Sequence, residues 1–202
     1  MSSTTLSPVK LQPPQVPGCP LPSWLTFGIV FRFACIVTSQ NAAMRRFKLE
    51  RDKIVSLARS VAATQGTVRV LINRIAGIED SSRYWSVFMV LDHLRIVDEG
   101  ITRIVEELTN DRPFAREVRI QDVKPSIDAG PNVVDRFIKS VAAYEATVNR
   151  LGRLGRRVRH PHPWFGPMTA HDWHCLAGIH HGLHRRQIER IKQALENARV
   201  GG

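Results

Sequence analysis

Two histidines that stand four residues apart, His180 and His184, have the spacing of a metal-binding pair on a helix. About one helical turn separates them, so both imidazoles project from the same side of the helix and can reach one ion. The apolar residues Trp173, Ala177 and Ile191 fall on that same side. Because such an apolar face marks the side that packs into the core, we expect both histidines to point inward.

His93 has a similar setting in an earlier helical segment. Met89, Val97 and Ile104 lie on its side of the helix axis, which again predicts an inward-facing imidazole. An unpaired polar group in a core costs roughly 1 to 3 kcal/mol, so each buried histidine needs a partner. A shared divalent cation would satisfy His93, His180 and His184 together and would leave an open coordination position for water or substrate.

Other roles for the neighbouring residues stay open at this point. His-x-x-x-His also occurs by chance on helices, and His181 can replace His180 as a ligand because it lies three residues before His184. Gln187 lies on the ligand face, where it can hydrogen-bond a ligand, line the pocket or serve as a structural amide. Cys175 lies about 180° around the helix from His184 and is a poor candidate for ligand or nucleophile.

A proline-rich segment, residues 160–167, precedes the helix of the histidine pair and is expected to cap the site. His160 and His162 stand beside prolines in it. Either can act as a proton shuttle, but solvated loop histidines are commoner. Trp164 and Phe165 are expected to anchor the segment in the core rather than to stack on a substrate. No catalytic residue is assigned from these patterns.

Four helices are predicted from apolar residues that recur every three or four positions. The last of them begins with Thr169 and Asp172, spaced as in a capping box. No stretch alternates long enough for a convincing strand, and no internal repeat is visible. We therefore expect an all-α four-helix bundle with a long, proline-containing crossover between helices two and three. The expected helices span residues 49–78, 85–109, 134–151 and 169–197, and the crossover spans residues 110–131.

Residues 1–43 differ in composition from the rest of the 202-residue chain, because prolines crowd their first half. We expect this N-terminal extension to be poorly ordered and the bundle domain to occupy residues 44–202. Deletion of residues 1–43 should then leave metal content and thermal stability nearly unchanged. Either Met1 or Met44 can be the natural start.

The apolar stretch from Trp24 to Val37 predicts no membrane association. Arg32 interrupts it, and it is shorter than the roughly 20 residues that span a bilayer. A secretory signal would carry a basic region directly before the apolar run, where this chain has prolines.

The formal net charge of +11 admits nucleic acid, acidic lipid or a small anionic substrate as a partner. The arginines of residues 150–159 suggest phosphate binding, but no aromatic residue stands among them and no nucleic-acid motif is present, so a solvated basic loop is favoured. The cysteines Cys19, Cys35 and Cys175 form no Cys-x-x-Cys pair and are odd in number. A disulfide framework or zinc knuckle is thereby excluded, and a cytoplasmic location is expected.

Two longer motifs resemble a known superfamily. The sequence His160-Pro-x-Pro-Trp-Phe-Gly-Pro-Met-Thr-Ala-x-Asp-Trp173, followed by His180-x-x-x-His184-x-x-Gln187, is similar to the last helix and preceding loop of the DinB/YfiT-like superfamily. Trp85-Ser-Val-x-x-Val-Leu-Asp-His93-Leu is similar to its second helix. The resemblance implies a bundle with a three-histidine site for zinc, nickel or iron, and all three ligand positions are filled here.

The resemblance also implies a range of activities. Members include thiol transferases that use bacillithiol or mycothiol, a maleylpyruvate isomerase and proteins taken to be hydrolases. We therefore expect an enzyme in which the ion activates a thiol, or alternatively water, toward a small-molecule substrate. A non-catalytic bundle fastened by the ion is a further alternative, and nucleic-acid binding ranks last. The chain is compatible with a homodimer.

Overall fold

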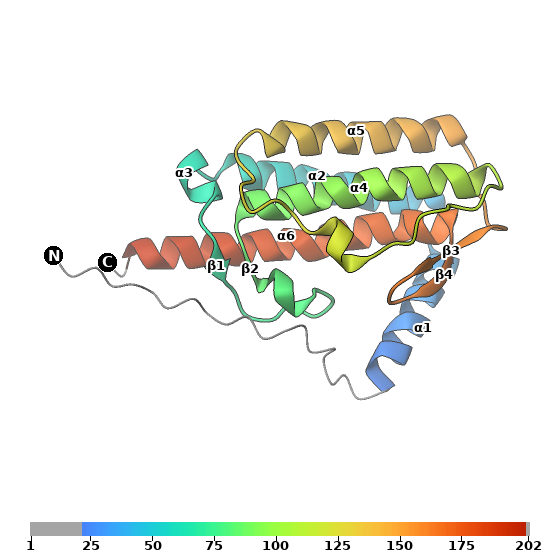
Figure 1. Ribbon diagram of the computed structural model, residues 1–202, viewed down its shortest axis with the longest axis horizontal. Coiled ribbons are helices and arrows are strands. Elements are labelled where there is room, and N and C mark those ends of the chain that lie inside the picture. Colours follow the sequence, from blue (N-terminus) through green and yellow to red (C-terminus); the bar gives the residue numbers. More distant parts are fainter. Residues whose placement is uncertain (1–21, 201–202) are drawn as a thin grey trace.

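The computed structural model describes residues 22–200, with the side chains of residues 28–198. Its four long helices pack side by side as a bundle, and shorter elements gather at its ends and along one side (Figure 1). The expected four-helix bundle is confirmed. In chain order the elements are α1 (Pro22–Val37), α2 (Gln40–Arg59), α3 (Ala63–Gly66), β1 (Val70–Leu71), η1 (Asp80–Arg83), β2 (Tyr84–Trp85), α4 (Val87–Thr109), η2 (Ile120–Val123), α5 (Val133–Leu151), β3 (Arg159–His162), β4 (Gly166–Thr169) and α6 (Ala170–Val200).

The bundle core lies between α2, α4, α5 and α6, and its centre is built from large side chains with almost no exposure to solvent. Phe47 of α2, Leu91 of α4, Phe137 of α5 and Ile188 of α6 are all fully buried. Burial of each such side chain contributes roughly 1.5 to 3 kcal/mol to stability, so the apolar faces that predict the helices also hold them together.

Local capping sets the start of the two helices that carry the candidate ligands. Ser86 accepts a hydrogen bond from the Met89 backbone amide at 3.2 Å and so begins α4. At α6, the Asp172 carboxylate accepts from the Thr169 amide at 2.9 Å, and the Asp172 amide donates back to the Thr169 hydroxyl at 3.2 Å. This reciprocal pair is the expected capping box, with aspartate in place of the usual glutamate or glutamine.

The predicted first helix, residues 49–78, is wrong at both ends. Ser39 caps α2 ten residues earlier, and the helix ends at Arg59. Gly66 then passes beneath the ring of Phe88, which leaves no space for a Cβ atom there. The chain continues into β1, which pairs with β2 at the start of α4. The three- and four-residue spacing of Val68 to Ile75 therefore belongs to a loop and a short strand.

Two short antiparallel strand pairs form in segments where the sequence predicts no strand. The first, β1 with β2, places Trp85 directly before α4. The second, β3 with β4, turns the proline-rich segment into a hairpin in which His160 pairs with Met168 and His162 with Gly166. Gly166 adopts a φ of 64°, which glycine tolerates better than other residues.

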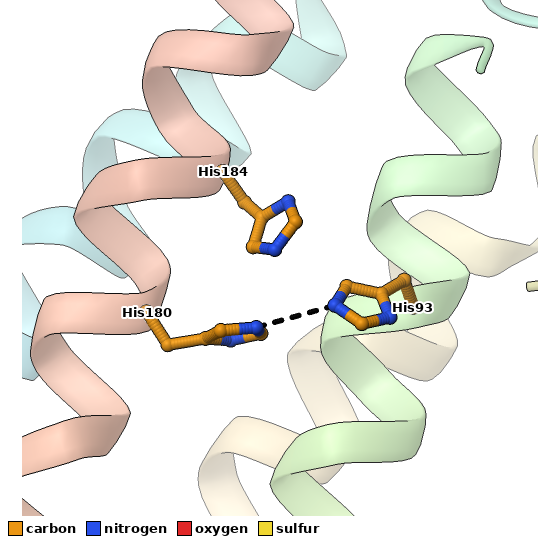
Figure 2. A group of neighbouring side chains, drawn as sticks. All are labelled: His93, His180 and His184. Atoms are coloured by element: carbon orange, nitrogen blue, oxygen red, sulfur yellow. Dashed lines mark hydrogen bonds between the residues drawn. The ribbon is translucent and has the colours of Figure 1, made fainter. Parts of the chain in front are cut away.

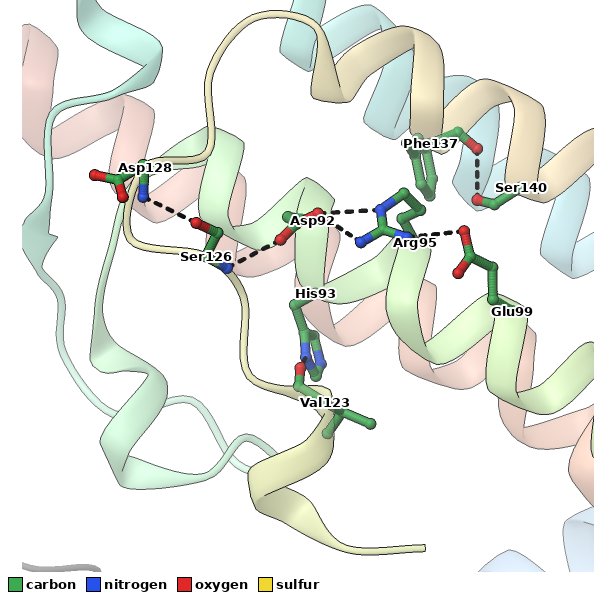
Figure 3. Close-up of polar contacts among 9 residues, drawn as sticks. All are labelled: Asp92, His93, Arg95, Glu99, Val123, Ser126, Asp128, Phe137 and Ser140. Carbon is green, nitrogen blue, oxygen red and sulfur yellow. Dashed lines mark hydrogen bonds and ion pairs between the residues drawn. The ribbon is translucent and has the colours of Figure 1, made fainter. Parts of the chain in front are cut away.

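The crossover between α4 and α5 is as long as predicted, and it lies against α4 near the candidate site (Figure 3). The buried Asp92 carboxylate accepts a hydrogen bond from the Ser126 amide at 2.9 Å and pairs with Arg95 on its own helix. Asp92 therefore anchors the crossover directly beside His93.

The proposed division at residue 43 falls inside α2, and α1 packs against α6 rather than standing apart from the bundle. Phe31 is 6% exposed and stacks on Phe165, with ring centroids 4.3 Å apart. The Arg32 guanidinium donates to the Phe165 carbonyl at 2.8 Å. Residues 1–21 lie outside the described residues.

Among the helices of the described chain, none has both the length and the apolar character needed to cross a membrane.

This packing predicts that Phe31→Ala destabilises the protein by about 3 to 5 kcal/mol, since the substitution removes a buried aromatic ring. Phe33→Ala on the same helix is the matched control, because Phe33 is 65% exposed and its loss should change stability by less than about 0.5 kcal/mol. Thermal melting of both variants measures the difference. If the two variants melt at the same temperature, α1 does not stabilise the fold in solution. That result would agree with the expectation from the sequence that residues 1–43 can be deleted.

Candidate metal centre

His93 projects from α4 toward His180 and His184 on α6, and the three imidazoles converge in the space between the two helices (Figure 2). One ring nitrogen from each lies within 4.8 Å of the others. The Nε2 atoms of His93 and His180 are 3.2 Å apart. The structure thus brings together the three histidines that the sequence pattern singles out.

Two of the imidazoles are held in a defined tautomer by groups outside the cluster. His93 Nδ1–H donates to the Val123 carbonyl at 2.6 Å, which leaves a lone pair on Nε2. His184 Nδ1–H donates to the Gln187 side-chain oxygen at 2.7 Å, and the Gln187 amide nitrogen donates to the Ser82 carbonyl at 2.7 Å. Such hydrogen bonds commonly orient histidine ligands of metals.

His180 lacks an equivalent support. Its Nδ1 atom is buried and has no hydrogen-bond partner among the described residues. Its Nε2 atom meets only the Nε2 atom of His93, where one nitrogen has to supply the hydrogen. The cluster therefore holds more nitrogen lone pairs than hydrogens to pair with them, and a cation would satisfy the lone pairs that remain.

Burial favours the neutral form of all three imidazoles. It lowers the pKa of His93 from 6.5 to about 4. Burial also places the pKa values of His180 and His184 well below their usual range, and the neighbouring histidines lower them further. Neutral imidazoles offer lone pairs rather than protons near neutral pH, which is the form that binds a divalent ion. The donor set therefore fits a metal.

His181, the alternative ligand, points elsewhere. It is fully buried, and its Nε2 atom lies 2.9 and 3.0 Å from the two carboxylate oxygens of Asp98. Its ring packs against Phe47, with centroids 4.4 Å apart. Burial raises the pKa of Asp98, and His181 opposes that shift. The two adjacent histidines therefore have different partners, and His181 is not a member of the cluster.

The remaining sequence candidates are distributed differently from what was expected. Cys175 is buried outside the cluster, as its position on the helix predicts. Phe165 anchors the hairpin as expected, but Trp164 is 46% exposed because it lies in the turn between β3 and β4. His160 is buried and meets the ring of Phe114 edge-on, so it is no solvated loop residue.

A cavity of about 260 Å³ opens beside the histidine cluster. Its walls are mainly apolar, and they come from α4, α6, the loop before β2, η2, α1 and the hairpin. His162 lines it from the hairpin, and burial lowers the pKa of this histidine to about 4. The cavity gives a small molecule a route to the cluster. Its lining includes Phe31, Trp85, Val97, Leu176, Leu183 and the three clustered histidines.

Some residues that shape the centre carry no signal in the sequence. Val123 and Ser82 act through backbone carbonyls, which any residue type provides. Asp98 was missed although a signal exists, since an acidic residue within the apolar pattern of a helix needs a buried partner. Asp92, directly before His93, is a similar case.

The fold and this site together define a helical bundle with a buried three-histidine cluster. The chain belongs to the DinB superfamily, which matches residues 46–188 and so includes all three histidines. It is 22% identical over 151 residues to the uncharacterized protein YuaE of Bacillus subtilis (strain 168), covering 62% of this chain and 93% of that protein. The solved structure of TT2238, a four-helix bundle protein, is similar with a TM-score of 0.53 and 16% identity, covering 75% of this chain and 98% of that one.

We expect His93→Ala, His180→Ala and His184→Ala each to abolish stoichiometric metal binding, because a three-ligand site loses most of its affinity with one ligand. Elemental analysis of the purified variants measures this. His181→Ala is the matched control and should keep the metal. It should still lower stability by about 3 kcal/mol or more, because Asp98 loses its buried partner. Loss of metal from His181→Ala with retention in His180→Ala would refute this assignment.

The low pKa values also predict how the metal-free protein responds to acid. His93 takes up a proton at about pH 4 in the folded chain, against an ordinary value of 6.5, so the unfolded chain binds more protons between these values. The contribution of His93 to the free energy of unfolding is therefore complete above about pH 6.5. It is lost as the pH drops to about 4, and the loss is about 3 kcal/mol. Denaturant titrations of chelator-treated protein across this range should show a shallower fall for His93→Asn. An unchanged slope would mean that His93 is not held neutral.

Proposed function

We propose that this protein is a metal-dependent enzyme in which His93, His180 and His184 hold a divalent zinc, nickel or iron ion. Its reaction is the transfer of a low-molecular-weight thiol to a small, largely apolar substrate. The observation that carries this proposal is the convergence of three neutral imidazoles at the wall of a mainly apolar cavity. When bound, the ion lowers the pKa of a coordinated thiol or water and so supplies a nucleophile near neutral pH.

The protein's own groups support this role in two ways. Val123 and Gln187 keep the Nε2 lone pairs of His93 and His184 available. Neutral ligands also leave the full charge of a divalent ion to act on a bound thiol. The apolar walls around Trp85 and Leu176 exclude water, which strengthens the electrostatic effect of the ion inside the cavity.

The choice of thiol transfer over hydrolysis rests on the superfamily's thiol transferases and on the apolar cavity, which suits an apolar electrophile. A hydrolase that activates water at the same ion is the alternative. A purely structural role for the ion is less well supported, because the cavity gives small molecules access to the cluster.

The arginine-rich loop adds little support for nucleic-acid binding. The Arg150 guanidinium lies 2.7 Å from a Glu106 carboxylate oxygen, and Arg157 lies 3.7 Å from Asp111. These acidic partners offset part of the positive charge that a phosphate backbone would need.

The test is a turnover screen of protein loaded separately with zinc, nickel or iron, using bacillithiol, mycothiol or cysteine with a chromogenic aryl halide. We expect a rate that rises with pH and then levels off, with a midpoint that changes with the metal, because the ion sets the pKa of the thiol. Metal content is measured at every pH, since acid releases the ion by protonating its ligands. His184→Ala is the control without metal.

Release of carboxylate from an ester panel, without thiol transfer, would replace the transferase with the hydrolase. If metal stays bound and no thiol or ester substrate turns over with any ion, the ion is structural.

A further inference from the structure

A second cluster of reactive side chains lies where α1 meets α6, outside the histidine cluster. Cys35 is 1% exposed on α1, and Cys175 is 5% exposed on α6. Both are free thiols. The imidazole of His171, one helical turn before Cys175, has its Nε2 atom 3.6 Å from the Cys175 sulfur. The same Nε2–H donates to the Cys35 carbonyl at 3.0 Å.

His171 therefore contacts both cysteine residues, Cys35 at its backbone carbonyl and Cys175 at its sulfur. By bonding the Cys35 carbonyl, and the Thr38 carbonyl at 3.1 Å, it holds the last turn of α1 against α6. The same Nε2–H group also lies close to the Cys175 sulfur, so a hydrogen-bond donor stands beside that thiol. The arrangement combines two buried thiols with a histidine, a set of groups that thiol chemistry uses.

The pKa values of the two thiols are shifted in opposite directions. The pKa of Cys175 is lowered to about 6, first by the hydrogen bond from Cys35 and also by His171, while burial opposes the shift. The pKa of Cys35 is raised, first by that hydrogen bond and then by burial. These opposite shifts favour Cys175 as the thiolate and Cys35 as the protonated thiol. The charged groups that also act on this cluster are Arg32, Arg156 and Asp172.

We propose that Cys35 and Cys175 form a redox-active dithiol, which a hydroperoxide oxidises to an intramolecular disulfide between α1 and α6. Cys175 is the thiol that reacts first, and Cys35 is the one that resolves it. The proposal does not depend on the metal centre or on the proposed transferase activity.

The chemistry balances with hydrogen peroxide as the oxidant. The Cys175 thiolate attacks one peroxide oxygen, the O–O bond breaks, and a sulfenic acid forms while hydroxide leaves and takes up a proton as water. The Cys35 sulfur then attacks the Cys175 sulfur, the S–O bond breaks, and a second water leaves with the Cys35 hydrogen. The two thiols lose two electrons and the peroxide gains them.

A disulfide here would act on the cavity. Val30, Phe31 and Ala34 of α1 line that cavity, all within five residues before Cys35. A covalent bond at Cys35 would hold this wall in place against α6. Cys35 also lies before residue 46, where the match to the superfamily begins, so the pairing joins a segment outside that match to a helix within it.

The experiment uses the full chain with Cys19→Ser, which removes the third thiol, and hydrogen peroxide as the probe. We expect titration with a thiol reagent to show loss of both remaining thiols, and non-reducing peptide mapping to recover one peptide pair joined through Cys35 and Cys175. Dithiothreitol should reverse both changes. The oxidised protein should melt roughly 5 °C or more above the reduced protein, because the bond closes a long loop in the unfolded chain.

Two variants sharpen the result. Cys35→Ser should still form a sulfenic acid at Cys175, trapped by dimedone, but should gain no thermal stability. His171→Gln should slow oxidation several-fold and leave metal content unchanged, since His171 lies outside the histidine cluster. The proposal fails if Cys35 stays open to alkylation after Cys175 is oxidised, if the disulfides join separate chains, or if both thiols of the folded protein survive the peroxide treatment.

Discussion

The arrangement of this bundle depends on one constraint, the burial of three imidazoles. Their ring nitrogens carry more lone pairs than there are hydrogen-bond donors nearby to pair with them. Removing such groups from water is unfavourable unless each finds a partner. Two short helices meet this need: η2 brings the Val123 carbonyl to His93, and η1 brings the Ser82 carbonyl to Gln187, which holds His184. These short segments around the bundle are therefore as much a part of the centre as α4 and α6.

Two adjacent histidines on α6 show that buried polar contacts fix the rotation of this helix about its own axis. Successive residues differ by about 100° around a helix axis, so His180 and His181 cannot share a partner. His180 meets His93 at the cavity wall, while His181 meets the buried Asp98 between Phe47 and Phe137. Rotating α6 to exchange the two histidines would leave the Asp98 carboxylate unpaired in the core. The contact between His181 and Asp98 thus fixes which histidine faces the cavity.

Sequence patterns predict this centre well where side chains with helical spacing make it, and poorly where the backbone does. His93, His180 and His184 follow from the apolar faces of two helices, because spacing along a helix maps directly onto a face. Val123 supplies a carbonyl, and no residue type marks a carbonyl. The false extension of the first helix to residue 78 has a different cause: Val68 to Ile75 repeat with helical spacing, but pairing of β1 with β2 and the close approach at Gly66 outweigh that local pattern.

The histidine cluster and the access route to it are built by different parts of the chain. The cluster itself lies between α4 and α6, inside the part of the chain that matches the superfamily. Access to it is shaped by α1 and the β3–β4 hairpin, which Arg32 ties together through the carbonyls of Phe165 and Pro167. Substitutions in α1 can therefore change access to the histidine cluster without changing the histidines themselves. Because α1 precedes the matched region, two members of the superfamily with the same histidines can differ in the wall of the cavity beside them.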